Sequence, residues 1–179
     1  MSLKIIIGCM FSGKTSEVMR EYTRWNNIGK KAIIINYYED ERYGTDNYVY
    51  NHDLNKKPCI KTKNLNDVSK DILMENDVIL INEGQFFSDL FDFCLLWCET
   101  HHKNIIVSGL DGDYLRKPFG QIYLLIPLAD QVIKLKSFCK KCNDGTQAIF
   151  SKRISDEKDD IVIGAGEKYI PVCRKHYLN

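Results

Sequence analysis

A glycine-rich loop near the N-terminus contains the residues whose types and spacing most directly suit chemistry. Gly8-Cys9-Met10-Phe11-Ser12-Gly13-Lys14-Thr15 fits the pattern G-x-x-x-x-G-K-[ST] at every fixed position. In such a loop, backbone N–H groups and the start of the next helix bind phosphate, the lysine reaches the β- and γ-phosphates, and the Ser/Thr hydroxyl binds Mg²⁺. A chance glycine-rich turn is the alternative. We expect a nucleoside triphosphate to contact Gly8, Met10, Phe11, Ser12, Gly13, Lys14 and Thr15.

A second polar group follows the apolar run at 78–81. In phosphate-loop proteins an acidic residue at the end of a neighbouring strand usually helps to hold Mg²⁺, and the next acidic residue can activate a nucleophile. Here the first position is Asn82, an amide without the charge that a hard cation prefers, so we expect it to orient metal-bound water. Glu83 is placed to accept a proton from an attacking hydroxyl, with a solvated loop carboxylate as the alternative. Gln85 is assigned to the same cofactor site.

Two short cysteine- and histidine-containing pairs near the C-terminus predict a metal site. Cys139 and Cys142 have C-x₂-C spacing, and Cys173 and His176 have C-x₂-H spacing. Two such turns supply the four ligands of a closed, tetrahedral, structural Zn²⁺ site. Three unrelated thiols and a surface histidine are the alternative. Cys94 and Cys98 lie one helical turn apart and are expected to be buried packing residues.

Alternating strands and helices must position these groups. Apolar runs predict strands at 3–7, 31–36, 78–81, 104–109 and 131–135, with a short one at 58–61. Helical periodicity predicts helices at 16–29, 66–74 with Val68 and Ile72 inward, and 89–101. Residues 37–57 are predicted to be irregular, and no helix is predicted after Cys139. This order indicates a parallel sheet covered on both faces. We therefore predict an α/β nucleotide-binding domain at 1–138 and a small zinc-binding domain at 139–179.

Composition restricts the class of protein further. The chain has 179 residues, 44% hydrophobic, and a formal net charge of +1, so the total charge indicates no nucleic-acid partner. A basic group formed by Lys140, Lys141, Lys152 and Arg153 is interpreted as a solvated face, with a binding patch as the alternative. The longest apolar runs are too short for a membrane span, and the first strand begins too early for a signal peptide. Seven cysteines, an odd number, indicate reduced thiols and a cytoplasmic protein.

Together these motifs resemble the type II thymidine kinases, and the resemblance extends over nearly the whole chain, from about residue 4 to about residue 177. That family shares G-P-M-F-S-G-K-[ST], D-E-G-Q-F-F and L-D-G-x-[FY]-x-R-K-P-F, which correspond here to 8–15, 82–87 and 110–119. It also shares a glycine loop that ends in tyrosine before the last metal pair, here 161–169. The implied fold is a phosphate-loop α/β domain with a C-terminal zinc ribbon and a substrate loop, the lasso, at about 151–170.

The resemblance implies transfer of the γ-phosphoryl group of ATP to the 5′-hydroxyl of thymidine. It implies Glu83 as the base, with Asp40 and Arg42 near the 5′-hydroxyl and the phosphates. The implied thymidine contacts are Met10, Phe86, Leu110, Tyr114, Phe119, Ser151, Val162, Gly164 and Tyr169. It further implies a homotetramer that is inhibited by thymidine triphosphate.

Three positions depart from the family pattern. Asn82 replaces aspartate, which predicts weaker Mg²⁺ binding. His176 replaces a fourth cysteine, and histidine is still a good zinc ligand. Cys9 replaces proline, which is expected to loosen the loop and to add a thiol near the phosphates. Two alternative functions stay open at this point: a broader deoxynucleoside kinase, and a nucleotide-binding regulator with a zinc ribbon.

Overall fold

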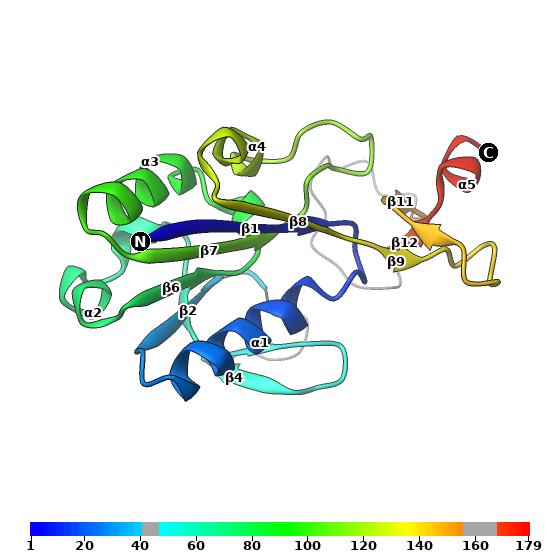
Figure 1. Ribbon diagram of the computed structural model, residues 1–179. Coiled ribbons are helices and arrows are strands. Elements are labelled where there is room, and N and C mark those ends of the chain that lie inside the picture. Colours follow the sequence, from blue (N-terminus) through cyan, green and yellow to red (C-terminus); the bar gives the residue numbers. More distant parts are fainter. Residues whose placement is uncertain (41–46, 156–167) are drawn as a thin grey trace.

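A six-stranded parallel sheet forms the body of the protein in the computed structural model, which describes residues 1–40, 47–155 and 168–179 (Figure 1). The strand order is β5-β2-β6-β7-β1-β8, and each neighbouring pair is parallel. The strands span β1 Ser2–Gly8, β2 Ala32–Tyr37, β5 Ile60–Thr62, β6 Val78–Ile81, β7 Asn104–Gly109 and β8 Gln131–Leu135. Because the strands are parallel, their carboxyl ends share one edge, where ligands of α/β proteins bind.

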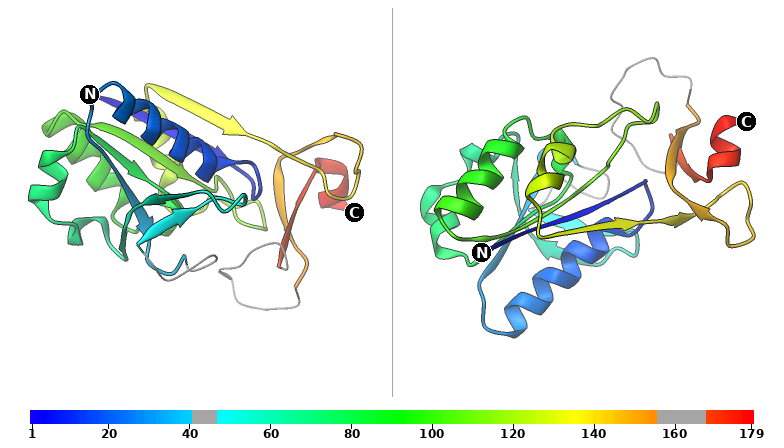
Figure 2. Two further views of the ribbon diagram at one scale, coloured as in Figure 1. Left: turned by 90° about the horizontal axis from the view of Figure 1, so that it is seen from below. Right: turned by 45° about the horizontal axis from the view of Figure 1, so that its top comes forward.

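The two faces of this sheet carry separate apolar cores because successive residues of a strand point to opposite sides. Ile6, Ile34 and Leu80 face helix α1 (Lys14–Asn27), where Val18 and Met19 are buried. Ile5, Ile79 and other odd-numbered strand residues face α3 (Leu90–Leu95) and the π-helical turn that continues it over Leu96–Thr100. Figure 2 shows α1 and α3 on opposite faces. The predicted α/β fold with helices on both faces is confirmed.

Two predictions about the connections were wrong. Residues 37–57 are not wholly irregular, because β3 (Tyr48–Tyr50) pairs with β4 (Lys56–Pro58) in an antiparallel hairpin. The single helix expected at 66–74 is a 3₁₀ turn, Leu65–Asp67, followed by α2, Lys70–Glu75. Val68 has extended backbone and separates the two. Val68 is buried as predicted, together with Leu65 and Leu73, but Ile72 is exposed.

The C-terminal part is built from very short elements. β9 (Ser137–Phe138) pairs with β10 (Gln147–Ala148), and β11 (Phe150–Arg153) pairs with β12 (Tyr169–Val172). The expectation of no helix after Cys139 was wrong, because α5 spans Arg174–Leu178. Five residues are too few to show helical periodicity in a sequence. The division at residue 138 stays a prediction.

The remaining elements complete the connections of the body. A 3₁₀ turn covers Gly84–Phe86 after β6, and α4 (Ile122–Leu125) continues into a 3₁₀ turn at Ile126–Leu128 before β8. Over the three described ranges, no helix is long and apolar enough to cross a bilayer.

Candidate active site and metal cluster

The glycine-rich loop leaves β1 at the carboxyl edge of the sheet and leads directly into α1. Gly8 has φ 151°, and a Cβ there would collide with the carbonyl oxygen of Leu135 on β8, so only glycine fits. Lys14 is buried, and its ammonium donates to the carbonyl oxygen of Cys9 at 2.8 Å, which curls the loop around the side chain. The buried Ser12 hydroxyl oxygen has no hydrogen-bond partner among the described residues. A lysine and an unsatisfied hydroxyl in a curled loop fit a phosphate.

The β3–β4 hairpin packs against this loop. The Asn51 side-chain amide donates to the Ser16 hydroxyl at 3.2 Å, and the His52 ring stacks on Phe11 with centroids 4.8 Å apart. The Asn51 side-chain oxygen also accepts from the backbone N–H groups of Asp53 and Asn55, which shapes the hairpin turn. His52 is exposed, and it contacts the glycine-rich loop, which the sequence did not indicate.

Glu83 follows β6 at the same edge and is held by Gln85. The Gln85 side-chain amide donates to Glu83 Oε2 at 2.7 Å, while its oxygen accepts from the backbone N–H of Leu110 at 2.9 Å. Glu83 is buried and takes the left-handed conformation, φ 55° and ψ 40°, which is uncommon for a residue with a side chain. A Cβ at Gly120 would collide with the Gln85 backbone, so the two segments pack tightly. This setting fixes one buried carboxylate at the carboxyl edge of the sheet, a feature that general-base chemistry can use.

Asn82 belongs to a chain of buried side chains that crosses three strands. Its oxygen accepts from the Ser108 hydroxyl at 2.8 Å, and its amide nitrogen donates to Asn36 Oδ1 at 2.9 Å. The Asn36 amide nitrogen donates to Asp40 Oδ2 at 3.1 Å. Asn36, Asn82 and Ser108 are each about 1% exposed. Both polar atoms of Asn82 therefore already contact protein groups, whereas the sequence predicted contact with metal-bound water.

The residues predicted to bind thymidine fall into small contact groups. Phe86 stacks on Tyr37 at 4.9 Å and meets the edge of Phe119 at 5.5 Å. The Arg153 guanidinium lies 3.7 Å from the centre of the Tyr114 ring and donates to the Tyr169 hydroxyl at 2.9 Å. Sequence reasoning missed Tyr37 and Arg153 as site residues. Arg153 was assigned to a solvated face, and its position two residues after Ser151, on the same face of a strand, was the available signal.

Two contacts join the glycine-rich loop to the C-terminal part. The backbone N–H of Met10 donates to the Ser151 hydroxyl at 3.0 Å, and the Cys9 thiol lies 3.5 Å from the carbonyl oxygen of Ala148. Cys9 is buried with Cys139, Val172 and Cys173, and this burial raises the pKa of its thiol. The Cys9 thiol faces the C-terminal part, and the expectation that it lies near the phosphates stays a prediction.

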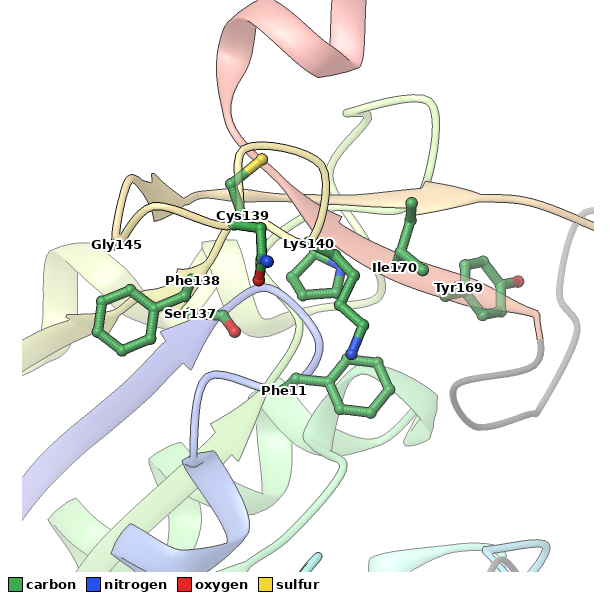
Figure 3. A pocket seen from close by; sticks show the side chains of 10 residues that line it. Phe11, Ser137, Phe138, Cys139, Lys140, Gly145, Tyr169 and Ile170 are labelled. Carbon is green, nitrogen blue, oxygen red and sulfur yellow. The ribbon is translucent and has the colours of Figure 1, made fainter.

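A cavity of about 530 Å³ lies between these two parts (Figure 3). Phe11 of the loop, Ser137 and Phe138 of β9, Lys140, and Tyr169 and Ile170 of β12 contribute to its lining. Predicted residues Phe11 and Tyr169 therefore share one cavity.

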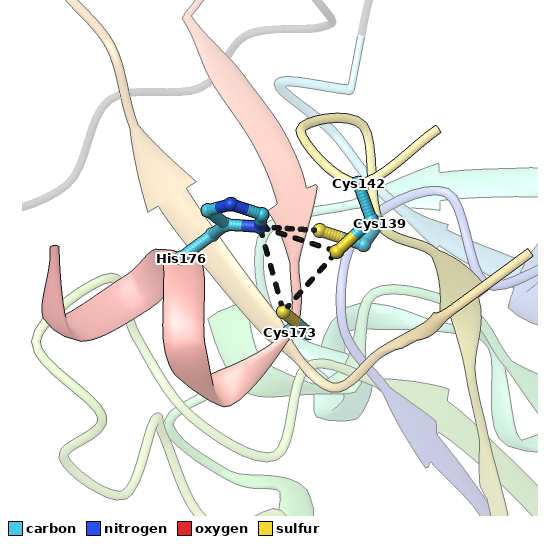
Figure 4. Close-up of side chains that lie close together, drawn as sticks. All are labelled: Cys139, Cys142, Cys173 and His176. Atoms are coloured by element: carbon cyan, nitrogen blue, oxygen red, sulfur yellow. Dashed lines mark hydrogen bonds between the residues drawn. The ribbon is translucent and has the colours of Figure 1, made fainter. Parts of the chain in front are cut away.

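Cys139, Cys142, Cys173 and His176 converge as predicted (Figure 4). His176 Nδ1 lies 3.5, 3.3 and 3.6 Å from the three sulfurs in that order, and the Cys142 and Cys173 sulfurs are 3.7 Å apart. A tetrahedral zinc with Zn–S of about 2.3 Å and Zn–N of about 2.0 Å sets S···S near 3.8 Å and S···N near 3.5 Å. The four side chains therefore already have the separations of a Cys₃His zinc site.

The thiols of this cluster differ in proton affinity. Burial raises the pKa of Cys139, but hydrogen bonds from the backbone N–H groups of Cys173 and Cys142 and from His176 bring it down to about 6. Burial and the neighbouring thiols of Cys139 and Cys173 raise the pKa of Cys142 to about 11. The Cys139 thiol therefore ionises more readily than the Cys142 thiol beside it.

Arg42, Val162 and Gly164, which the resemblance placed near the phosphates and the thymine base, lie outside the described residues. The central section of the predicted lasso lies there too. Its two ends are described, and β11 and β12 pair them in register from Phe150↔Val172 to Arg153↔Tyr169.

These features define a class: a parallel α/β protein with a phosphate-type loop and a buried carboxylate at one sheet edge, joined to a Cys/His cluster. A thymidine kinase family model matches residues 1–177. The chain is 43% identical over 176 residues to a thymidine kinase of Yaba monkey tumor virus, covering 98% of this chain and 94% of the relative. It is 41% identical over 177 residues to that of Vaccinia virus (strain Western Reserve), covering 99% and 97%. A rice thymidine kinase is 40% identical over 182 residues, covering 99% of this chain and 66% of the relative. The chain belongs to the thymidine kinase family.

Proposed function

We propose that this protein transfers the γ-phosphoryl group of ATP to the 5′-hydroxyl of thymidine, giving thymidine monophosphate and ADP. Membership of the thymidine kinase family supports the reaction. The observation that carries the proposal is the buried Glu83 carboxylate, held by Gln85 at the same sheet edge as the glycine-rich loop. A protein that only bound nucleotide would need no such base.

The loop residues bind and align the triphosphate. Backbone N–H groups of the loop, the Ser12 hydroxyl and the Lys14 ammonium surround the phosphates, with Gly8, Met10, Phe11 and Gly13 shaping the loop. The Thr15 hydroxyl would hold Mg²⁺, and the ion would supply neutralisation of the charge on the phosphates. Glu83 accepts the proton of the 5′-hydroxyl as that oxygen attacks the γ-phosphorus. Asn82 and Gln85 act through protein contacts, since the polar atoms of both side chains are already engaged.

Substrate recognition in this proposal uses both parts of the chain. The aromatic contacts of Phe86 and Phe119 and the backbone near Leu110 form the apolar wall for a pyrimidine. Tyr114, Tyr169 and Ser151 connect that wall to the lasso, whose backbone near Val162 and Gly164 completes the enclosure. Arg42 joins Asp40 beside the reacting oxygen. A closed lasso excludes water, which would otherwise accept the phosphoryl group.

Zn²⁺ is proposed as the ion of the Cys139, Cys142, Cys173 and His176 cluster, in a structural role, because all four positions are filled by protein ligands. The residues from 139 onward are proposed as the zinc-binding domain. A homotetramer and feedback inhibition by thymidine triphosphate are proposed from the family alone. None of the seven cysteines, all of which lie within the described residues, forms a disulfide, which supports the reducing cytosol as the compartment.

A panel of acceptors tests the function directly. The purified protein is incubated with ATP, Mg²⁺ and one deoxynucleoside at a time, and monophosphate formation is measured. We expect thymidine to be preferred over deoxycytidine, because cytosine presents the opposite hydrogen-bond pattern at N3 and N4 and leaves buried backbone groups unpaired. Equal efficiency with deoxycytidine would favour a broader deoxynucleoside kinase. No transfer to any nucleoside would favour the nucleotide-binding regulator.

A further inference from the structure

Three polar side chains lie side by side at the carboxyl ends of neighbouring strands, at the sheet edge that also carries Glu83. Strand register pairs Ile35 with Ile81 and Ile81 with Val107, so the next residues, Asn36, Asn82 and Ser108, occupy successive positions across β2, β6 and β7. All three are buried on the face that α1 covers. Asp40, on the turn after β2, accepts from Asn36 and completes this row of Ser108, Asn82, Asn36 and Asp40.

The hydrogen bonds of this row have one direction. An ionised carboxylate only accepts, so the Asn36 amide must present its NH₂ group to Asp40. Asn36 Oδ1 then faces Asn82, which must donate in turn, and Asn82 Oδ1 is left to accept from the Ser108 hydroxyl. Each amide accepts on one side and donates on the other, so each group in the row is satisfied only in this orientation.

We propose that Asn82 and Asn36 are positioning residues for Asp40. Their hydrogen bonds keep one donor-to-acceptor order from Ser108 to Asp40, and this order holds the Asp40 carboxylate in place for the transfer step. The inference rests on the proposed function, in which Asp40 lies near the 5′-hydroxyl. It gives a physical reason for an amide at position 82, where the family pattern has aspartate. It also assigns a role to Asn36, which no motif singled out.

Replacement of Asn82 by aspartate is the decisive change. The introduced carboxylate keeps the Ser108 hydrogen bond but turns an acceptor toward Asn36 Oδ1. If Asn36 rotates to donate to this new carboxylate, its own oxygen turns toward the Asp40 carboxylate. One acceptor–acceptor contact therefore remains in a buried site, whichever way Asn36 turns, and that contact is costly.

A second substitution, at the Asp40 end of the row, should restore the hydrogen bonds that Asn82→Asp breaks. In the double variant Asn82→Asp/Asp40→Asn, the new amide at position 40 donates to Asn36 Oδ1, and Asn36 donates to the new carboxylate at position 82. Each group of the row is again satisfied, with the two hydrogen bonds of Asn36 reversed and Ser108 still donating to residue 82. The single Asp40→Asn variant can keep the original direction, because its amide oxygen still accepts from Asn36.

The test measures thermal unfolding and steady-state kinetics for the wild type, the two single variants and the double variant. We expect Asn82→Asp to lower Tm by roughly 4 to 8 °C and the double variant to recover most of that loss. We expect Asn82→Asp to lower kcat with thymidine about tenfold, with KM and the Mg²⁺ concentration for half-maximal rate little changed. The double variant should regain Tm and not kcat, since it lacks the carboxylate at position 40. Asn55→Asp, the same change at an exposed position outside the helices, is the control and should alter neither quantity.

Three outcomes would overturn the proposal. Additive losses of Tm in the double variant would show that the row has no fixed direction. An Asn82→Asp variant with unchanged Tm and kcat, and a lower Mg²⁺ requirement, would assign Asn82 to the metal instead. Unchanged kcat in Asp40→Asn would show that the row has no catalytic role. The Tm values of Asn82→Asp and the double variant would still decide whether its hydrogen bonds have a fixed direction. Failure of the proposed function is separate, because the wild type would then not phosphorylate thymidine.

Discussion

The body of the protein and its C-terminal part are stabilised in different ways. In the body, continuous apolar strands fill two large cores on opposite faces of the sheet. In the C-terminal part the buried apolar cluster contains only Cys139, Ala148, Val172 and Cys173 among the described residues, together with Cys9 from the body. Two of these are proposed metal ligands. Hydrophobic burial therefore accounts for the folding of the body, whereas in the proposed function the C-terminal part relies on bonds to zinc.

This difference matters for the proposed catalysis, because the two parts share the proposed substrate site. The Met10 and Cys9 contacts fasten the glycine-rich loop to β10 and β11, and the Tyr177 hydroxyl donates to the Tyr114 backbone at 2.7 Å. The part with the small core therefore supports residues on both sides of the proposed thymidine pocket. Loss of the ion would disorganise the pocket without unfolding the sheet.

The largest expected effect comes from removing a metal ligand. His176→Ala leaves three thiols, and we expect the zinc content to fall from about one per chain to near zero and turnover to be lost, because metal binding energy here is folding energy. Zinc content, far-UV circular dichroism and turnover are measured together. The body should keep its helical signal.

His176→Cys is the matched control, since it restores a fourth ligand and should keep both zinc and activity. A fully active, metal-free wild-type protein would contradict the comparison between the two parts.

The second effect is a loss of catalytic rate in the body without a loss of stability. Glu83→Gln keeps the size of the side chain and removes its basicity, so we expect kcat to fall by about 10²–10⁴ with KM for thymidine little changed. Zinc content and Tm should stay at wild-type values. Wild-type turnover in this variant would show that Glu83 is not the base.

A smaller effect is expected from the side chain that holds Glu83. Gln85→Met keeps the length of the side chain but breaks both of its hydrogen bonds, so we expect kcat to fall about tenfold. Gln85→Glu places a second carboxylate beside Glu83, and like charges disfavour ionisation. Its pH–rate profile should therefore lose activity at a higher pH on the acidic side than that of the wild type. Superimposable profiles would indicate that residue 85 does not act on Glu83.

What the sequence could predict follows the same division. The long strands of the body were predictable because runs such as Ile5-Ile6-Ile7 are buried on both faces and need no partner to be recognised. The ligand pairs of the C-terminal part were predictable because their spacing alone brings donors together. The β3–β4 hairpin was not, since its strands have three residues each and its turn depends on the Asn51 side chain.

The partners of the site residues were also beyond the sequence. Gln85 was predicted at the cofactor, and its contact with Glu83 depends on a turn in which Glu83 takes a left-handed conformation. The direction of the Asn82 row depends on strand register, which local patterns do not specify. Cys9 was unexplained because its neighbours, Ala148 and Val172, are about 140 or more residues away in the chain.

The smallest expected effect tests the junction between the two parts through Cys9. Cys9→Ala removes a buried sulfur and its contact with the Ala148 carbonyl, a loss of about 1 kcal/mol, or a fall in Tm of roughly 2–4 °C. Cys98→Ala is the matched control, because Cys98 is also buried but lies in the core of the body.

The discriminating measurement is the rate at which a coloured chelator removes zinc. Cys9→Ala should release zinc several-fold faster than the wild type, since it loosens the cluster that contains Cys139 and Cys173, while Cys98→Ala should release it at the wild-type rate. Equal release from both variants would mean that Cys9 stabilises the protein as a whole and has no special place at the junction.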